Sequence, residues 1–147
     1  MRVRGDIVSD QASALTRVVL ATPFHRYCSL ELVSQEPGAA VCRIPVDDAT
    51  ANVNGVLHGG IVHAFIDVAA FLGLVPLFGP GETAVTHDIH VSVLKPAPRG
   101  SIVEFRSRVL RRGKNVAFIR TDAYAITGQG ESYVATGTVT KSFVRYG

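Results

Sequence analysis

The sequence has little of what marks several large classes of protein. Only 18% of its 147 residues are charged, and 47% are apolar. A disordered chain has the opposite balance, because it lacks the apolar surface that drives folding. We therefore expect residues 1–147 to form a single folded domain. The apolar surplus further suggests surface buried between subunits.

Cysteine is scarce, with Cys28 and Cys42 as the only two. They form no CxxC pair and no zinc-ligand spacing, which argues against a disulfide scaffold and a structural metal site. We expect them to be buried free thiols on neighbouring strands, out of register, in a reducing cytosol. Residues 1–6 contain no apolar stretch of the kind found in signal peptides, so a cytoplasmic location is expected.

Positive charge is also limited. The net charge is +3, and the excess falls mainly between residues 106 and 114, without an aromatic stacking platform. Nucleic acid is therefore not an expected partner.

The run from Gly60 to Phe78 is apolar enough to resemble a membrane span, but Asp67 at its centre would cost about 2.5–3.5 kcal/mol in a bilayer. We expect a core helix there and no membrane partner.

Several chemical signatures are missing. There is no glycine-rich phosphate loop, no dinucleotide fingerprint and no G-x-S-x-G nucleophile turn. On a strand, the side chain of His87 would point to the opposite face from those of Asp88 and His90, so the three cannot converge on one metal ion without a bulge. His58 and His63 are five residues apart, not four as in a helical zinc pair. We therefore expect no metal site.

Turn residues and periodicity predict an α+β fold. Ser9 or Asp10 can cap a first helix that ends near Thr22, before Pro23. Its expected buried face consists of Ala12, Leu15, Val18 and Val19. The predicted strands are Tyr27–Gln35, Ala39–Val46 and the ranges 83–94, 101–110, 116–126 and 133–144. One long helix, apolar nearly all round, lies between the second and third strands, which suggests a curved antiparallel sheet wrapping it.

Asp67 lies in the middle of that apolar helix. An ionised carboxylate is rarely buried without a partner or a function. Asp67 could be a general base or a nucleophile. It could instead form a structural pair with His63, one turn earlier on the same face.

Gly59 and Gly60 begin the same helix. The first N–H groups of a helix lack intrahelical acceptors and lie at the positive end of its dipole. Without a Cβ, a glycine also lets a substrate carbonyl approach the backbone. The Gly59 N–H could therefore stabilise an oxyanion, although small residues could equally serve helix packing under a sheet.

Together with two residues of the preceding turn, these positions form a recognisable pattern. Asn52, His58, Gly59, Gly60 and Asp67, at the entry to a central helix, resemble the hotdog-fold thioesterases, specifically the PaaI-like acyl-CoA thioesterase branch. The segments 84–97, 112–115 and 135–138 also resemble this family. The resemblance covers about residues 23–145, after an N-terminal segment and extra helix at 1–22. It implies a hotdog fold, with one long central helix wrapped by six antiparallel strands, and an enzyme that hydrolyses thioesters.

The resemblance also implies roles for residues. Asn52 would position the water or the thioester, His58 would orient the turn and assist at the carbonyl, and Thr86 would support Asp67. The residues expected to bind the substrate are Gly60, Arg111, Arg112, Gly113 and Lys114. From the residues alone, Asn52 could simply satisfy loop backbone groups, and Thr86 is an ordinary strand residue. Charged turns are also often only solvated.

Spacing along the helix predicts a shared site. Eight residues separate Gly59 from Asp67, about 12 Å of helix rise, whereas reacting atoms must lie about 3–3.5 Å apart. If both act on one carbonyl, they come from different chains, and a homodimer is also what the resemblance implies. The apolar surplus favours a homotetramer.

Acyl-CoA would be the substrate, with coenzyme A leaving as the thiol and no separate cofactor. Two alternatives stay open: a 3-hydroxyacyl-thioester dehydratase or hydratase of the same fold, and a non-catalytic acyl-CoA-binding protein.

Overall fold

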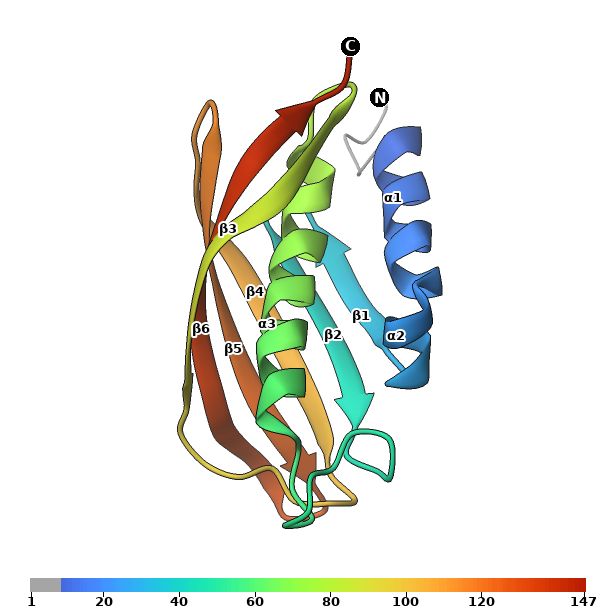
Figure 1. The fold of residues 1–147 in the computed structure, drawn as a ribbon, viewed down its shortest axis with the longest axis vertical. Helices are drawn as coiled ribbons and strands as arrows, with labels where there is room; N and C mark the ends of the chain where they lie inside the picture. The colour runs from blue at the N-terminus through green and yellow to red at the C-terminus, as the bar shows by residue number, and fades with distance from the viewer. Residues whose placement is uncertain (1–8) are drawn as a thin grey trace, which may run out of the picture.

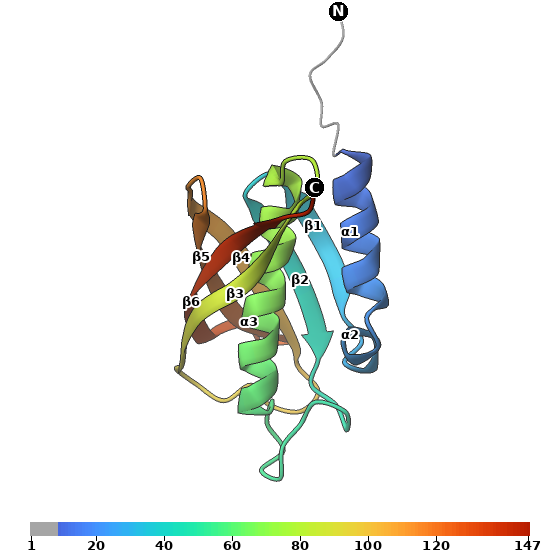
Figure 2. The same ribbon diagram turned by 45° about the horizontal axis from the view of Figure 1, so that its top comes forward.

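The computed structural model describes residues 9–147 as a curved six-stranded antiparallel sheet wrapped around one long helix (Figure 1). Helix α3 (Gly59–Leu74) lies against the concave face and continues into a short 3-10 turn, η1 (Val75–Leu77). Helices α1 (Asp10–Ala21) and α2 (Pro23–Tyr27) lie beside the edge formed by β1 (Figures 1 and 2). This is the α+β hotdog architecture that the sequence predicted.

The strands pair out of chain order. Their bounds are β1 Glu31–Glu36, β2 Ala39–Pro45, β3 Glu82–Val93, β4 Ile102–Arg112, β5 Val116–Thr127 and β6 Gly130–Arg145. Their order across the sheet is β1-β2-β4-β5-β6-β3, with every neighbouring pair antiparallel. Strand β3 therefore lies at one edge, where one side of its backbone has no partner strand within residues 9–147.

Helix α3 buries only one of its two apolar faces. Along most of the helix the buried residues recur every three or four positions, as in an amphipathic helix. They are Val62, Phe65, Ile66, Ala69, Ala70, Leu72, Gly73 and Leu74. The opposite stripe, Ile61, Ala64, Val68 and Phe71, is half-buried. The run Gly59–Leu77 is long and apolar enough to span a membrane, but half of it is buried inside the fold. Asp67 lies in the half-buried stripe.

Two glycines let α3 approach the sheet closely. A Cβ on Gly73 would meet the Ser107 hydroxyl at 2.7 Å, and one on Gly137 would meet the Ile66 side chain at 2.7 Å. Ser107 in turn donates a hydrogen bond of 2.7 Å to the Ala69 carbonyl. Larger residues at either glycine would push the helix off the sheet, because protein interiors leave no room for extra atoms.

The N-terminal region differs from the prediction in detail. Ser9 caps α1 by accepting from the Ala12 N–H at 3.1 Å, but Val18, expected on the buried face, is 65% exposed. Pro23 ends α1 and also begins α2, because proline suits the first position of a helix. Tyr27 therefore lies in α2, not in the first strand, which begins at Glu31.

The two cysteines are free and buried, as predicted, but they do not lie on neighbouring strands. Cys28 is the residue that caps the end of α2, while Cys42 lies on β2. Burial raises the pKa of Cys42 to about 12, so its thiol stays protonated and inert. The expectation drawn from residues 1–6, that the chain has no signal peptide, lies outside the described residues.

Candidate functional site

The turn before α3 is held in shape by its own polar side chains. The Asn52 side-chain oxygen accepts from the N–H groups of Asn54 and Val56, at 2.9 and 3.3 Å, and Gly55 adopts a positive φ of 73°. Asn52 thus satisfies loop backbone groups, one of the two roles considered for it. The same residue also lines the pocket at the start of α3.

His58 caps α3. Its backbone is extended, with φ −60° and ψ 129°, and its ring Nδ1 accepts from the Gly60 N–H at 2.9 Å. A Cβ on Gly60 would come within 3.0 Å of that ring. Gly60 is therefore small because the capping imidazole packs against it, and its N–H is already used.

Gly59 differs from Gly60 in both respects. Within residues 9–147, no acceptor takes the Gly59 N–H, and a Cβ there would meet nothing within 4 Å. The donor lies at the positive end of the α3 dipole. It borders a pocket of about 410 Å³, which is lined by Asn52, Val56, Leu57, Gly59, Val62, Val93, Leu94, Lys95, Pro96, Ala97 and Val134. This is the geometry of an anion-binding helix terminus open to a ligand.

Asp67 has two firm partners, both on the sheet. The Thr86 hydroxyl donates to Asp67 Oδ1 at 2.6 Å, and the Lys141 ammonium donates to the same oxygen at 2.8 Å. Lys141 Nζ also donates to Thr86 Oγ1 at 2.8 Å. The three side chains form a closed triangle that fixes the carboxylate. The predicted contact between Thr86 and Asp67 is therefore present.

Lys141 is the member of this triangle that sequence reasoning missed. Its side chain is 3% exposed, while that of Asp67 is 34% exposed. The sequence does contain a signal for it. Lys141 is separated from the buried Ala135 and Val139 by an even number of positions along β6, so the three side chains lie on the same face of the strand. A lysine on the inward face of a strand is rare unless it is paired.

A bulge in β3 sets which side chains face α3. The pairing of β3 with β6 shifts register between Thr86 and Asp88. Thr86 consequently faces α3, and beyond the bulge Ile89 packs on the core. His87, the extra residue, bonds Ser142 at 2.8 Å. In residues 9–147, no three His, Cys, Asp or Glu side chains gather as a metal-binding group.

The pairing of Asp67 with His63, considered from the sequence, does not form. His63 Nδ1 lies 2.9 Å from the Gly59 carbonyl oxygen instead, on the exposed side of the helix. The carboxylate turns toward β3 and β6. Asp67 is thus not half of a helical i, i+4 pair, and its partners come from distant parts of the chain.

Within one chain, the predicted site residues fall into two groups. Asp67 and Thr86 line a pocket of about 270 Å³, together with Val19, His25, Val68, Phe71, Ala84 and Lys141. The pocket at Gly59 shares no residue with it. The structure therefore brings Asn52, His58 and Gly59 together, and separately Asp67 with Thr86. A single chain does not unite the two groups.

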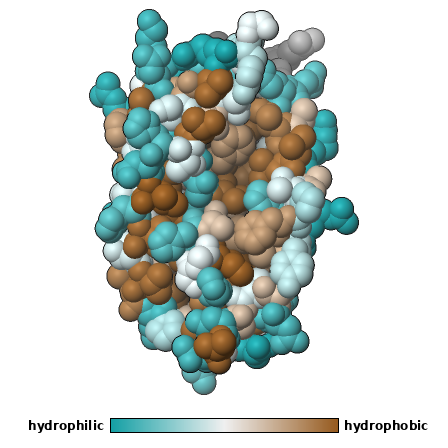
Figure 3. All heavy atoms as spheres, viewed as in Figure 1, coloured by the Kyte–Doolittle hydropathy of each residue, from teal (hydrophilic) through white to brown (hydrophobic). Residues whose placement is uncertain are grey.

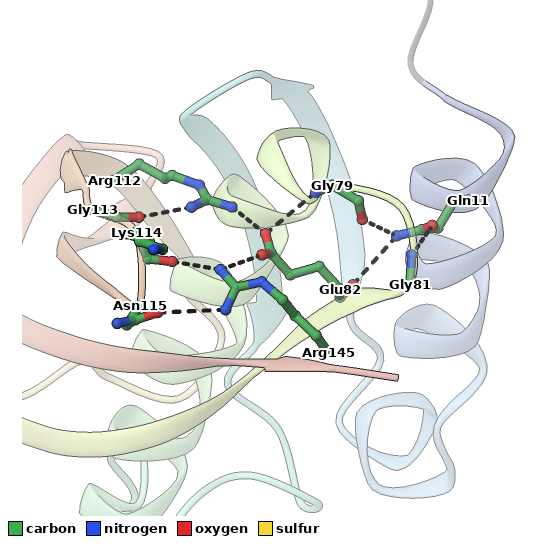
Figure 4. Close-up of polar contacts among 9 residues, drawn as sticks. All are labelled: Gln11, Gly79, Gly81, Glu82, Arg112, Gly113, Lys114, Asn115 and Arg145. Carbon is green, nitrogen blue, oxygen red and sulfur yellow. Dashed lines mark hydrogen bonds and ion pairs between the residues drawn. The ribbon is translucent and has the colours of Figure 1, made fainter. Parts of the chain in front are cut away.

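The basic turn between β4 and β5 lies at the end of the molecule where α3 ends, opposite the start of α3 (Figure 1). Here Arg112 pairs with Glu82, which is 5% exposed and also pairs with Arg145 at 2.9 Å (Figure 4). Arg112 also donates to the Gly113 carbonyl at 2.7 Å. Arg112 is thus engaged in an internal ion-pair cluster, while Arg111 and Lys114 are exposed.

This Glu82 cluster is expected to support the fold. We expect Glu82→Ala to lower the free energy of unfolding by about 3 kcal/mol, because it leaves two guanidinium groups around a buried, empty position. Glu131→Ala is a matched control, since Glu131 pairs with Arg106 at 2.6 Å but is 46% exposed, and should cost less than about 1 kcal/mol. Urea denaturation at one protein concentration measures both. Equal losses would contradict a special role for the cluster.

Comparisons with known proteins identify the family and the fold of this chain. Residues 54–132 match the family model described as the thioesterase superfamily. Acyl-coenzyme A thioesterase 13 of Homo sapiens is 30% identical over 93 residues, which are 63% of this chain and 66% of that protein, just under two thirds of its length. The chain superposes on a thioesterase family protein from Silicibacter pomeroyi with a TM-score of 0.86 and 25% identity, covering 92% of this chain and 99% of that one. For the phenylacetic acid degradation protein PaaI from Thermus thermophilus, the TM-score is 0.72 at 27% identity, over 82% and 97% of the two chains.

Proposed function

The chain belongs to the thioesterase superfamily, and from this premise we propose that it hydrolyses acyl-CoA thioesters to a free acid and coenzyme A. The observation that carries the proposal is the Gly59 N–H, a backbone donor at a helix start that has no acceptor within the described chain and opens onto a pocket. A thioester carbonyl oxygen there would gain negative charge during attack. Such a donor is typically worth about 2.7–4 kcal/mol in the transition state.

In the proposed reaction, Asp67 takes a proton from a water molecule as the water oxygen attacks the carbonyl carbon. The carbonyl oxygen becomes an oxyanion held by the Gly59 N–H. When the intermediate collapses, the carbon–sulfur bond breaks, and the proton returns to the thiolate of coenzyme A. Direct attack by Asp67 through a covalent anhydride is the other course open to this carboxylate.

The site is proposed to be completed by a second copy of the chain. Strand β3 offers a free edge, and the half-buried stripe of α3 runs beside it. Apolar side chains gather over α3 and along its flanks on this face (Figure 3). If two β3 edges pair antiparallel about a two-fold axis that passes beside the first half of α3, midway between Gly59 and Asp67, the start of one α3 lies beside the middle of the other. The Gly59 of one protomer would then face the Asp67 of its partner.

The same arrangement supports a place for coenzyme A. The basic turn lies at the end of α3, so an antiparallel partner would bring its Gly59 pocket toward that turn. The exposed Arg111 and Lys114 are the proposed contacts for the phosphates, with the Gly113 backbone between them. Arg112 contributes through the Glu82 cluster, by holding the turn. We propose a cytoplasmic homodimer, assembled further into a homotetramer.

Release of free thiol from a panel of acyl-CoAs with short, long and aromatic acyl groups tests the activity. Turnover of at least one of them is expected. The alternatives have their own readouts: loss of the enoyl absorbance of crotonyl-CoA would indicate a hydratase, and tight acyl-CoA binding without thiol release would indicate a binding protein. Either of those results, in place of thiol release, would overturn the proposed function.

A further inference from the structure

Lys141 is a buried ammonium whose contacts all converge on the candidate base. Its Nζ lies 2.8 Å from Asp67 Oδ1 and 2.8 Å from Thr86 Oγ1, and 5.5 Å from the centre of the Phe71 ring. Within residues 9–147, Asp67 is the one carboxylate in ion-pair range of it. A lysine ammonium has only donors and no acceptor. The direction of each hydrogen bond in the triangle follows from this.

Because Lys141 must donate to Thr86, the Thr86 oxygen is an acceptor in that bond. The single hydroxyl hydrogen of Thr86 is then directed at Asp67 Oδ1, in agreement with the 2.6 Å separation. Both donors thus bind the same carboxylate oxygen. Oδ2 of Asp67 has no protein partner in the described part of the chain, and the side chain is 34% exposed toward its pocket.

We infer that Lys141 is a positioning residue for hydrolysis: with Thr86, which it orients, it holds Oδ1 of Asp67 so that Oδ2 is the oxygen presented to the attacking water. The inference rests on the proposed function, since it names the residue that aims the base. A base displaced by about 1 Å can cost a hundredfold in rate. Lys141 does this without touching the substrate.

The burial of Lys141 gives this role a pH signature. Burial lowers the pKa of the Lys141 ammonium below its ordinary value of 10.5, while Asp67 opposes the shift. The groups that face it are Asp67 on α3, His25 on α2, the neutral Thr86 on β3 and Ala117 on β5. Loss of the Lys141 proton weakens its hold on Oδ1. We therefore expect kcat to fall on the alkaline side at a pH below 10.5.

The test compares Lys141→Met with wild type. Methionine is an unbranched side chain only one atom shorter than lysine, and Asp67 is exposed enough to be rehydrated, so the variant is expected to fold. We expect kcat to fall about a hundredfold while KM changes by less than about threefold, and the alkaline limb of the kcat profile to disappear. Thr86→Val should lower kcat about as much as Lys141→Met does, and the double variant should lose little more than either single variant. Thr86→Ser should keep most of the wild-type kcat, because it keeps the hydroxyl.

A folded Lys141→Met with near wild-type kcat, or with its alkaline limb unchanged, would overturn the inference. So would a variant whose only defect is a lower melting temperature. A crystal structure of the variant supplies a readout without turnover: a rotated Asp67 carboxylate is expected, and an unchanged one contradicts the positioning role. If wild type itself releases no thiol, the proposed function fails, and the carboxylate orientation still decides whether Lys141 positions Asp67.

Discussion

Asp67→Asn is expected to lower kcat for acyl-CoA hydrolysis by about a hundredfold to ten-thousandfold, the range that a general base contributes. The change keeps the size and shape of the side chain, so the hydrogen bonds to Thr86 and Lys141 can largely persist. What is lost is the carboxylate that we propose accepts the proton of the water. Steady-state thiol release under saturating acyl-CoA measures the effect.

One structural effect must be separated from this chemistry. Removing the carboxylate leaves the buried Lys141 ammonium without its ion-pair partner, which lowers stability. Asp67→Asn combined with Lys141→Met removes both charges and should recover stability but not activity. Full activity in Asp67→Asn would leave the fold unaffected and would place the base elsewhere.

Gly59→Pro is expected to lower kcat by about a hundredfold to a thousandfold, the cost of losing one oxyanion donor. Proline removes the N–H, yet it suits this position: Gly59 is the first residue of α3, where proline is favoured. His58 already has the extended backbone that a residue before proline requires. The fold should therefore survive, as circular dichroism would check.

Gly59→Ala is the matched control. It adds a Cβ into open space and keeps the donor, so we expect a higher KM with a far smaller loss of kcat. If alanine were as damaging as proline, steric filling of the pocket would explain both variants, and the oxyanion role of Gly59 would be wrong.

The two inactive variants also test whether the site is shared. In a heterodimer of Asp67→Asn with Gly59→Pro chains, one of the two sites combines an intact Asp67 with the partner's intact Gly59. Random pairing should therefore restore about a quarter of wild-type activity. Co-expression with two affinity tags isolates the heterodimer. An absence of recovery in a purified heterodimer would show that each chain builds its own site.

Much of the fold followed from local sequence. Gly79, Pro80 and Gly81 end the long apolar run, and alternating strands flanked by turn residues gave six strands close to their observed bounds. These features are local, because propensity and periodicity depend on neighbours along the chain. The start of α3 at Gly59 and Gly60 was equally local, whereas the capping of this helix by the His58 ring was found only in the structure.

The short helix α2 was missed for a related reason. Pro23 indicates an end to α1, and the same residue also suits the start of a helix. Only the packing of Phe24 and His25 against Phe65, at ring separations of 5.8 Å, selects the second outcome. Such contacts, between residues 41 and 40 positions apart, leave no mark on the local pattern.

The sequence by itself determined that Asp67 and Gly59 are eight residues apart on one helix and hence that one chain cannot aim both at one atom. Only the tertiary structure decided what surrounds them. The β3 bulge turns Thr86 toward α3, and the pairing of β3 with β6 sets Lys141 directly opposite Thr86. The partners of Asp67 therefore depend on strand register, and register is fixed by the packing of the whole sheet, because a slip of one residue would send every side chain to the other face.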